Sequence, residues 1–206
     1  TAYTQPALFA IEYALAELWR ARGIHADAVL GHSIGEYAAA CLAGVFSLED
    51  GMKLVTARGR LMGSLPQGGV MSTIFAPTQQ VQDAIQNAGL VSIAAVNAPD
   101  STVISGAAAD VQAIVEHFKA AGVQSRPLVV SHAFHSPLMD PILDEFERVA
   151  ATCKFHAPKI PLISNITGQP FAQGQIPDVA YWRKHIRSTV QFAPGIQTLH
   201  NQGFDL

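Results

Sequence analysis

The chain has 206 residues, of which 49% are hydrophobic and 14% charged, and its formal net charge is −3. This composition is typical of a well-buried globular protein, and with no basic run longer than Arg183-Lys184 it disfavours nucleic acid and anionic membranes as partners. The sequence contains no apolar run long enough to span a membrane and no signal-peptide pattern. Cys41 and Cys153 lie in helical patterns without a CxxC motif, which is typical of reduced, buried thiols. The sequence therefore predicts a soluble, cytoplasmic α/β protein.

The first third of the chain predicts helices around one short strand. Apolar residues recur at helical spacing over residues 5–19, at positions Leu8, Ile11, Leu15 and Leu18. A short strand is expected over residues 28–30, followed by a turn at Ser33 and a helix over residues 34–44. Ser47 precedes Glu49 and Asp50, which is typical of a helix N-cap, and predicts a second helix running to about residue 62.

Residues 68–130 show a distinct pattern of alternating predicted strands and helices. The predicted order is a strand over 69–77, a helix over 78–89 capped by Thr78, strands over 91–99 and 101–106, a helix over 107–122 and a strand over 123–130. This βαββαβ order is that of the ferredoxin-like split motif. We therefore predict a ferredoxin-like small subdomain over residues 68–130, inserted into a larger α/β subdomain formed by residues 1–67 and 131–206. The second half of that larger unit predicts helices over 139–152, 179–187 and 194–201 and a short strand over 160–164.

The stretch Gly31-His32-Ser33-Ile34-Gly35 is the first candidate for chemistry. A serine on a tight turn between a strand and a helix has its hydroxyl exposed above the sheet, which is the arrangement of a nucleophile. The backbone N–H of Ile34 is then a natural donor to an oxyanion. The simpler alternative is a glycine-lined turn whose serine caps the helix.

A serine nucleophile needs a base, and His135 is the best candidate among eight histidines because it follows a predicted strand end. The acids between Ser33 and His135 lie on helices or in the inserted unit, and none follows a strand of the main sheet. The sequence therefore favours a Ser–His dyad over a triad. Arg58 lies on the second helix after the nucleophile, where a solvated side chain is the ordinary interpretation.

The motifs "GHSIGEY", "ARGRLM", "VNAPDSTVISG", "SHAFHSP" and "LISNITG" together resemble the acyltransferase domain of modular type I polyketide synthases. They are also similar to the malonyl-CoA:acyl-carrier-protein transacylases of fatty acid synthesis. The resemblance covers essentially the whole chain in order. It implies an α/β-hydrolase-like large subdomain with an inserted ferredoxin-like small subdomain, in agreement with the order of elements.

The resemblance also implies roles for individual residues. Ser33 matches the nucleophile that becomes acylated, His135 matches the general base and acid, and the amide of Ile34 matches the oxyanion donor. Arg58 matches an arginine that binds the free carboxylate of the extender unit, a role that suits a planar guanidinium. Asn97 matches an asparagine near the acyl pocket. His185 falls where the family uses a backbone carbonyl, in place of an acid, to orient the catalytic histidine.

Two features bear on the choice of acyl group. In this family the quartet His132-Ala133-Phe134-His135 usually accompanies malonyl selection, because Phe134 fills space that a smaller serine would leave for a 2-methyl group. Ile34, where methylmalonyl enzymes often carry glutamine, points the same way. A single methyl group is worth only about 1–3 kcal/mol of discrimination, so methylmalonyl selection stays open as an alternative.

The resemblance implies a ping-pong exchange between malonyl-CoA and the phosphopantetheine arm of an acyl carrier protein, with no bound cofactor and no metal. It implies a ketosynthase and other synthase domains as covalent neighbours. The family's Gly-Gln-Gly-rich opening loop and its Gly-Pro-Gly ending are not in these 206 residues, so we expect them to be the interior of a longer acyltransferase domain. Two other functions remain open: a serine thioesterase or hydrolase of α/β-hydrolase type, and a non-catalytic docking segment.

Overall fold

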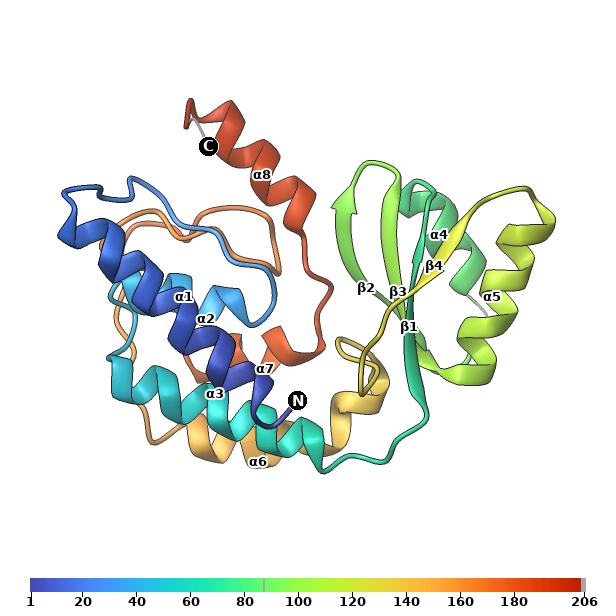
Figure 1. Cartoon of the computed structure of the whole chain (residues 1–206), viewed down its shortest axis with the longest axis horizontal. Coiled ribbons are helices and arrows are strands. Elements are labelled where there is room, and N and C mark those ends of the chain that lie inside the picture. The colour runs from blue at the N-terminus through green and yellow to red at the C-terminus, as the bar shows by residue number, and fades with distance from the viewer. Residues whose placement is uncertain (87, 205–206) are drawn as a thin grey trace.

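The computed structural model describes residues 1–86 and 88–204, which form a larger helical part and a smaller part built on one sheet (Figure 1). The larger part contains the helices α1 (Thr4–Ala21), α2 (Gly35–Leu42), α3 (Leu48–Gly63), α6 (Leu143–Ala150), α7 (Val179–Arg187) and α8 (Phe192–Asn201). The chain crosses to the smaller part after α3 and returns before α6, as predicted for an inserted unit.

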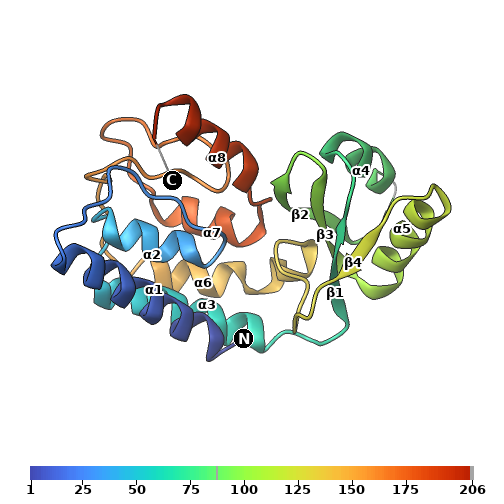
Figure 2. The ribbon, with the colours of Figure 1, turned by 45° about the horizontal axis from the view of Figure 1, so that its top comes forward.

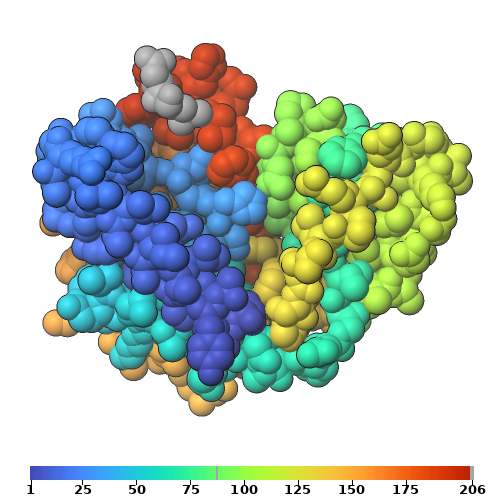
Figure 3. Space-filling model, in the orientation of Figure 1, coloured from blue at the N-terminus to red at the C-terminus, as the bar shows by residue number. Residues whose placement is uncertain are grey.

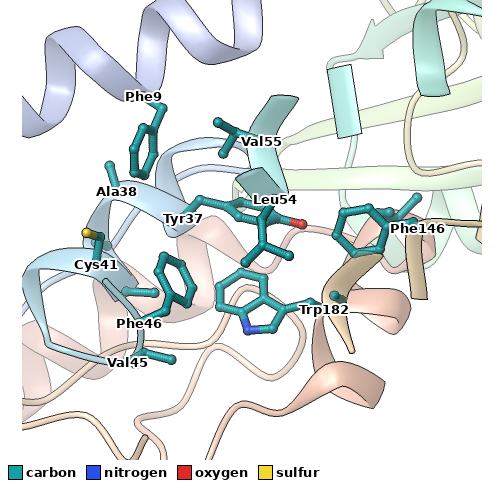
Figure 4. Close-up of a cluster of buried hydrophobic side chains, with 14 of the residues drawn as sticks. Phe9, Tyr37, Ala38, Cys41, Val45, Phe46, Leu54, Val55, Phe146 and Trp182 are labelled. Carbon is teal, nitrogen blue, oxygen red and sulfur yellow. The ribbon is translucent and has the colours of Figure 1, made fainter. Parts of the chain in front are cut away.

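Aromatic side chains form the core of the larger part (Figure 4). The rings of Tyr37 on α2 and Trp182 on α7 lie 4.4 Å apart, and Phe46 meets the same indole edge-on at 5.5 Å. Leu54 of α3 and Phe146 of α6 are fully buried beside them. Because burial of such side chains is the main favourable term in folding, this cluster fixes α2 against α3, α6 and α7.

The larger part contains only isolated β-bridges where two strands were expected. Val29 pairs in parallel with Leu162, and Ile163 pairs with Pro170 in the opposite sense. The Val29 amide donates to the Pro161 carbonyl at 2.8 Å. Residues 28–30 and 160–164 thus lie as expected but are too sparsely paired to count as strands, and the single bridge still anchors the segment that leads into Ser33.

The smaller part is a four-stranded antiparallel sheet. Its strands are β1 (Gly69–Ile74), β2 (Val91–Ala98), β3 (Ser101–Ala107) and β4 (Ser125–Pro127), in the spatial order β2-β3-β1-β4. The helices α4 (Thr78–Ile85) and α5 (Ala108–Ala120) follow β1 and β3 and lie together on one face (Figure 1). The observed order of elements is the predicted βαββαβ order.

The two faces of the sheet pack against different parts of the protein, because side chains alternate between the faces along each strand. Ile74, Ile93 and Ile104 face α4 and α5, whereas Met71 and Val103 face the larger part. The segment after α7 pairs with the edge of β2, since the Val190 amide donates to the Ala94 carbonyl at 2.9 Å and the Val96 amide donates to the Val190 carbonyl at 2.9 Å, and the Val190 side chain packs on that second side. The two parts therefore meet along β2 (Figure 2).

Three local expectations needed correction. The predicted helix over 139–152 is a 3-10 helix, η1 (Pro137–Ile142), followed by α6, because Pro141 lacks the N–H that a continuous α-helix needs. Thr78 does not cap α4: Pro77 occupies the N-cap position, and the Thr78 hydroxyl lies 3.2 Å from that of Thr102. Cys153 lies beyond the end of α6 and is half-buried.

Helix α1 forms as predicted but buries little of its apolar side. It lies on the surface of the larger part (Figure 3), where Leu8, Ile11 and Leu15 are 41%, 59% and 51% exposed. The residues that it buries against the rest of the chain are Gln5 and Phe9. Across residues 1–86 and 88–204, no helix combines the length and apolar character needed to cross a membrane.

Candidate active site

The turn that carries Ser33 lies between the Val29 bridge and the start of α2. Ser33 has a φ of +52°, and among the described residues only Ser33 and His135 combine a side chain with a positive φ. The turn is tight: a Cβ on Gly31 would lie 2.1 Å from the carbonyl carbon of Gly35. Glycine at position 31 is therefore required by the close approach of two backbone segments, which accounts for the first glycine of the motif.

Asn165 holds this turn from the other side of the Val29 bridge. Its side-chain oxygen accepts from the Ser33 amide at 2.7 Å, and its side-chain nitrogen donates to the Gly31 carbonyl at 2.6 Å. Since the Ser33 amide is occupied, the amide of Ile34 is the next along the chain to face an oxyanion, and it donates to no other group among the described residues. This geometry fits the predicted role of the Ile34 amide.

His135 lies against the Ser33 hydroxyl, with Nε2 2.7 Å from Oγ. Only 3% of the residue is exposed. It lies in the loop after β4, where its backbone adopts a left-handed conformation with a φ of +58°. Ser136 stabilises that turn, because its hydroxyl donates to the Ala133 carbonyl at 2.7 Å. The structure thus brings the predicted nucleophile and the predicted base into direct hydrogen-bond contact, from positions 102 residues apart.

The surroundings of His135 favour its neutral form. Burial lowers its pKa well below the usual value of 6.5, and the charge of Arg58 and the proximity of His185 act in the same direction. The backbone of Ser188 opposes them by raising the pKa. A neutral imidazole beside a serine hydroxyl is ready to accept its proton.

Nδ1 of His135 is buried without a hydrogen-bond partner among the described residues, so the orienting carbonyl predicted at His185 stays a prediction; the backbone of Ser188, three residues later, is near enough to raise the pKa of His135. Ser188 is the residue at which α7 ends, where the chain becomes extended and backbone groups lose their helical partners. The His185 side chain is instead directed at Glu36, with Nε2 3.1 Å from Oε2. Within residues 1–86 and 88–204, no carboxylate forms a hydrogen bond with His135, which agrees with a dyad.

Arg58 of α3 reaches the same hydroxyl. Its Nη2 donates to Ser33 Oγ at 3.1 Å, and its Nη1 donates to the side-chain oxygen of Gln5 at 2.6 Å. The residue is only 2% exposed, its Nε is buried without a hydrogen-bond partner in the described structure, and its guanidinium lies 5.7 Å from the centre of the Tyr37 ring. A buried guanidinium with a free donor, beside a nucleophile, is suited to an anionic substrate group.

Gln5 was not anticipated from the sequence. It is 5% exposed, it lies on α1, and its side-chain nitrogen donates to Met62 Sδ at 3.3 Å while its oxygen accepts from Arg58. The only signal was a glutamine in the first turn of a helix with a largely apolar sequence. Gln5 therefore holds Nη1 of the Arg58 guanidinium in place, while Nη2 lies near Ser33.

The remaining predicted pocket residues lie at the junction of the two parts. Phe134 is partly buried and packs against the cores of both parts. Asn97 of β2 does not touch Ser33; its side-chain oxygen lies 2.9 Å from Nε2 of His32. His132 is buried away from the hydroxyl, with Nε2 3.1 Å from the Leu65 carbonyl. A cleft of about 630 Å³ between α4, β2 and residues 187–191 lies apart from these residues: Ser188 lines it, but Ser33, His135 and Phe134 do not.

In the part of the chain that the structure describes, no group of three or more His, Cys, Asp or Glu residues is arranged to hold a metal ion. The groups that the structure brings together at the site are Ser33, His135, Arg58 and the backbone amides around them. These groups can activate a hydroxyl, bind an anion and stabilise an oxyanion.

Comparison with known proteins gives consistent matches over the whole chain. The sequence profile of the acyl transferase domain matches residues 1–205. The chain is 47% identical over 204 residues to a type I phenolphthiocerol synthesis polyketide synthase of Mycobacterium marinum and 50% identical over 197 residues to the mycoketide-CoA synthase of Mycobacterium tuberculosis. It covers 10% and 5% of those two proteins, so it spans a small share of their length.

Solved structures extend the match to the fold. The acyltransferase domain from the second module of the salinomycin polyketide synthase has a TM-score of 0.94 at 49% identity, with 98% of this chain and 48% of that one covered. The malonyl CoA-acyl carrier protein transacylase of Clostridium perfringens has a TM-score of 0.93 at 26% identity, with 98% and 66% covered. These matches confirm the predicted fold class.

Proposed function

Since the chain belongs to the acyl transferase domain family, we propose that it transfers an acyl group from a coenzyme A thioester to the phosphopantetheine thiol of an acyl carrier protein, through an ester on Ser33. The observation that carries this proposal is that two side chains converge on one oxygen: Ser33 Oγ lies 2.7 Å from His135 Nε2 and 3.1 Å from Arg58 Nη2. The first contact suits activation of the hydroxyl, and the second suits an acyl group that carries an anion.

In the first half-reaction, His135 Nε2 takes the Ser33 proton while Oγ attacks the thioester carbonyl carbon. The Ile34 amide donates to the oxyanion of the tetrahedral intermediate. The C–S bond then breaks, and the thiol of coenzyme A leaves with the proton from His135. The second half-reaction repeats these steps with the carrier thiol as nucleophile, and it restores the free serine.

Arg58 is proposed to bind the free carboxylate of a malonyl group. Its buried Nε has no hydrogen-bond partner in the described residues and its Nη2 lies 3.1 Å from Ser33 Oγ, whereas Gln5 occupies Nη1. A carboxylate can accept from two such donors at once, and charge-assisted hydrogen bonds in a buried site are among the stronger polar contacts. Phe134 and Ile34 are proposed to disfavour a 2-methyl substituent, which makes malonyl-CoA the preferred substrate and methylmalonyl-CoA the alternative.

By analogy with the synthases that the chain resembles, we propose that it works inside a polyketide synthase, with a ketosynthase and other synthase domains as covalent neighbours. The proposal needs no bound cofactor, because malonyl-CoA and the carrier phosphopantetheine are substrates. A serine hydrolase of thioesterase type is the second candidate. It is less favoured because His135 has no carboxylate partner in the described residues and because a buried guanidinium beside the serine serves an anionic acyl group.

The deciding experiment is incubation of the protein with radiolabelled malonyl-CoA and with malonyl-CoA plus a carrier protein, read by the mass of the Ser33 peptide and by label on the carrier. We expect Ser33→Ala to retain no label. Arg58→Ala should lose malonyl loading by at least about a hundredfold while an acetyl group, which lacks the carboxylate, loses far less. Steady release of free malonate, with no label on the carrier, would favour the hydrolase.

Selectivity is tested separately, by competition between malonyl-CoA and methylmalonyl-CoA in a single reaction. Phe134→Ser should raise the methylmalonyl share of acylated Ser33 by about tenfold or more, in line with the worth of one methyl group. Leu138→Ala, a change at a neighbouring partly buried position, serves as the control for loosened packing. An unchanged ratio in Phe134→Ser would remove Phe134 from the acyl pocket.

A further inference from the structure

A buried carboxylate lies directly beneath the Ser33 turn and takes no part in the exchange described above. Glu36, on the first turn of α2, is 0% exposed and has no arginine or lysine among its described partners. Burying an ionisable group is costly unless its hydrogen-bonding atoms are all satisfied. The hydrogen-bond partners of the Glu36 carboxylate should therefore show why it is buried there.

Three donors converge on this carboxylate. Oε2 accepts from the backbone amide of Asn165 at 2.9 Å and lies 3.1 Å from Nε2 of His185. Oε1 accepts from the hydroxyl of Tyr181, which also lies 2.9 Å from Ser164 Oγ. Burial, followed by the neighbouring Glu36, raises the pKa of Tyr181, which keeps that hydroxyl protonated and able to donate.

The contact with Asn165 connects Glu36 to the Ser33 turn. Asn165, whose amide Glu36 holds, accepts the Ser33 N–H at 2.7 Å and donates to the Gly31 carbonyl at 2.6 Å. It thereby spans the tight turn from both sides. The left-handed conformation of Ser33 is unfavourable for a residue with a side chain and persists only when its surroundings impose it.

We propose that Glu36 is a positioning residue, which holds Ser33 in its reactive geometry through Asn165, with Tyr181 and His185 holding Glu36 in turn. Glu36 contacts neither the Ser33 hydroxyl nor the acyl pocket residues, so its influence passes through the backbone of the turn. The proposal builds on the nucleophilic role of Ser33. It identifies the acid of the motif "GHSIGE" as the support of the turn, in place of the missing third member of a triad.

The test is a double-mutant cycle between Glu36→Gln and Asn165→Ala, measured on the full-length protein. Acylation of Ser33 by malonyl-CoA is followed by rapid quench and intact mass, and phosphonylation of Ser33 by a fluorophosphonate is followed in parallel. We expect each single change to lower both rate constants about tenfold to a hundredfold, because displacements of about 1 Å at a reacting atom have effects of this size. The KM for malonyl-CoA should stay within threefold.

The double variant should be no slower than the slower single variant, since both changes cut the same support. The matched control is Glu12→Gln: its carboxylate packs beside Gly35 at the start of α2 but forms no hydrogen bond with the Ser33 turn in the described residues, and its rates should stay within twofold. If Glu36→Gln does not fold, Tyr181→Phe takes its place in the cycle, with an expected loss of about threefold that is again not additive with Asn165→Ala.

Additive losses in the cycle, or a folded Glu36→Gln protein with unchanged rate constants, would overturn the positioning role. The two probes separate this outcome from a failure of the proposed function. A wild-type protein that reacts with the fluorophosphonate but not with malonyl-CoA would count against the acyl transfer proposed above. The cycle measured with the fluorophosphonate would still decide the role of Glu36.

Discussion

The two glycines that flank Ser33 are expected to respond in opposite ways to the same substitution. In Gly31→Ala the new Cβ would lie 2.1 Å from the Gly35 carbonyl carbon and 2.2 Å from the Glu36 amide nitrogen. Both are backbone atoms, so the turn and the start of α2 must separate by more than about 1 Å to reach ordinary contact. The Ser33–His135 contact of 2.7 Å cannot survive such a shift, and we expect Ser33 acylation to fall at least about a hundredfold.

Gly35→Ala is the matched control. There the nearest atom to an added Cβ is a Glu12 side-chain oxygen at 3.6 Å, an ordinary contact, and position 35 is already helical. We expect Ser33 acylation within threefold of the wild type and a free energy of unfolding unchanged or raised by at most about 1 kcal/mol, since alanine favours a helix over glycine. Rate constants from quenched acylation and urea unfolding curves give both quantities. Equal damage from the two substitutions would refute this reasoning, because it would show that the motif needs glycine for reasons other than close approach at position 31.

Three further outcomes are expected. Trp182→Ala should lower the free energy of unfolding by about 3–5 kcal/mol, because the indole is fully buried between Tyr37 and Phe46; a urea midpoint that barely moves would contradict this. Ser47→Ala should cost about 1 kcal/mol in the same assay, because its hydroxyl accepts from the Asp50 amide at 3.1 Å at the start of α3, and Ser47→Asp should restore it. The pKa of His135 is lower in the folded than in the unfolded protein, so the unfolded chain binds more protons below pH 6.5 and stability is lost as pH falls below that value. We expect this residue to contribute a slope of up to about 1.4 kcal/mol per pH unit, which His135→Gln should remove; an unchanged slope would show that His135 is not held neutral.

Local signals predicted the fold well wherever a few neighbouring residues decide the conformation. The Ser47 cap, each element of the βαββαβ order along the chain and the bounds of α7 all come from patterns within about fifteen residues. The errors fall where distant residues decide. Thr78 begins α4 and its hydroxyl lies beside that of Thr102 on β3, 24 residues along the chain, while Pro77 occupies the cap position. The strand at 28–30 depends on a partner more than 130 residues away and is reduced to one bridge.

The site shows the same division. Ser33 was predictable because strand, turn and helix lie in one stretch, and His135 because it follows the return from the inserted unit. Gln5 and Asn165 were missed because their importance comes only from contacts with residues 53 and 132 positions away. The orienting carbonyl assigned to His185 stays a prediction, because Nδ1 of His135 has no hydrogen-bond partner among the described residues and the sequence does not reveal which backbone group at the end of α7 faces it.

The left-handed backbone shared by Ser33 and His135 places a limit on attempts to make this protein more heat-resistant. Glycine would relieve about 1 kcal/mol or more of conformational cost at each position, since it alone adopts that region freely. A library enriched only for survival at high temperature is therefore drawn towards variants that have lost both groups at the reacting centre. Directed evolution of this domain therefore needs a screen for acylation at every round. At positions 33 and 135, the residues that favour stability differ from those that the chemistry needs.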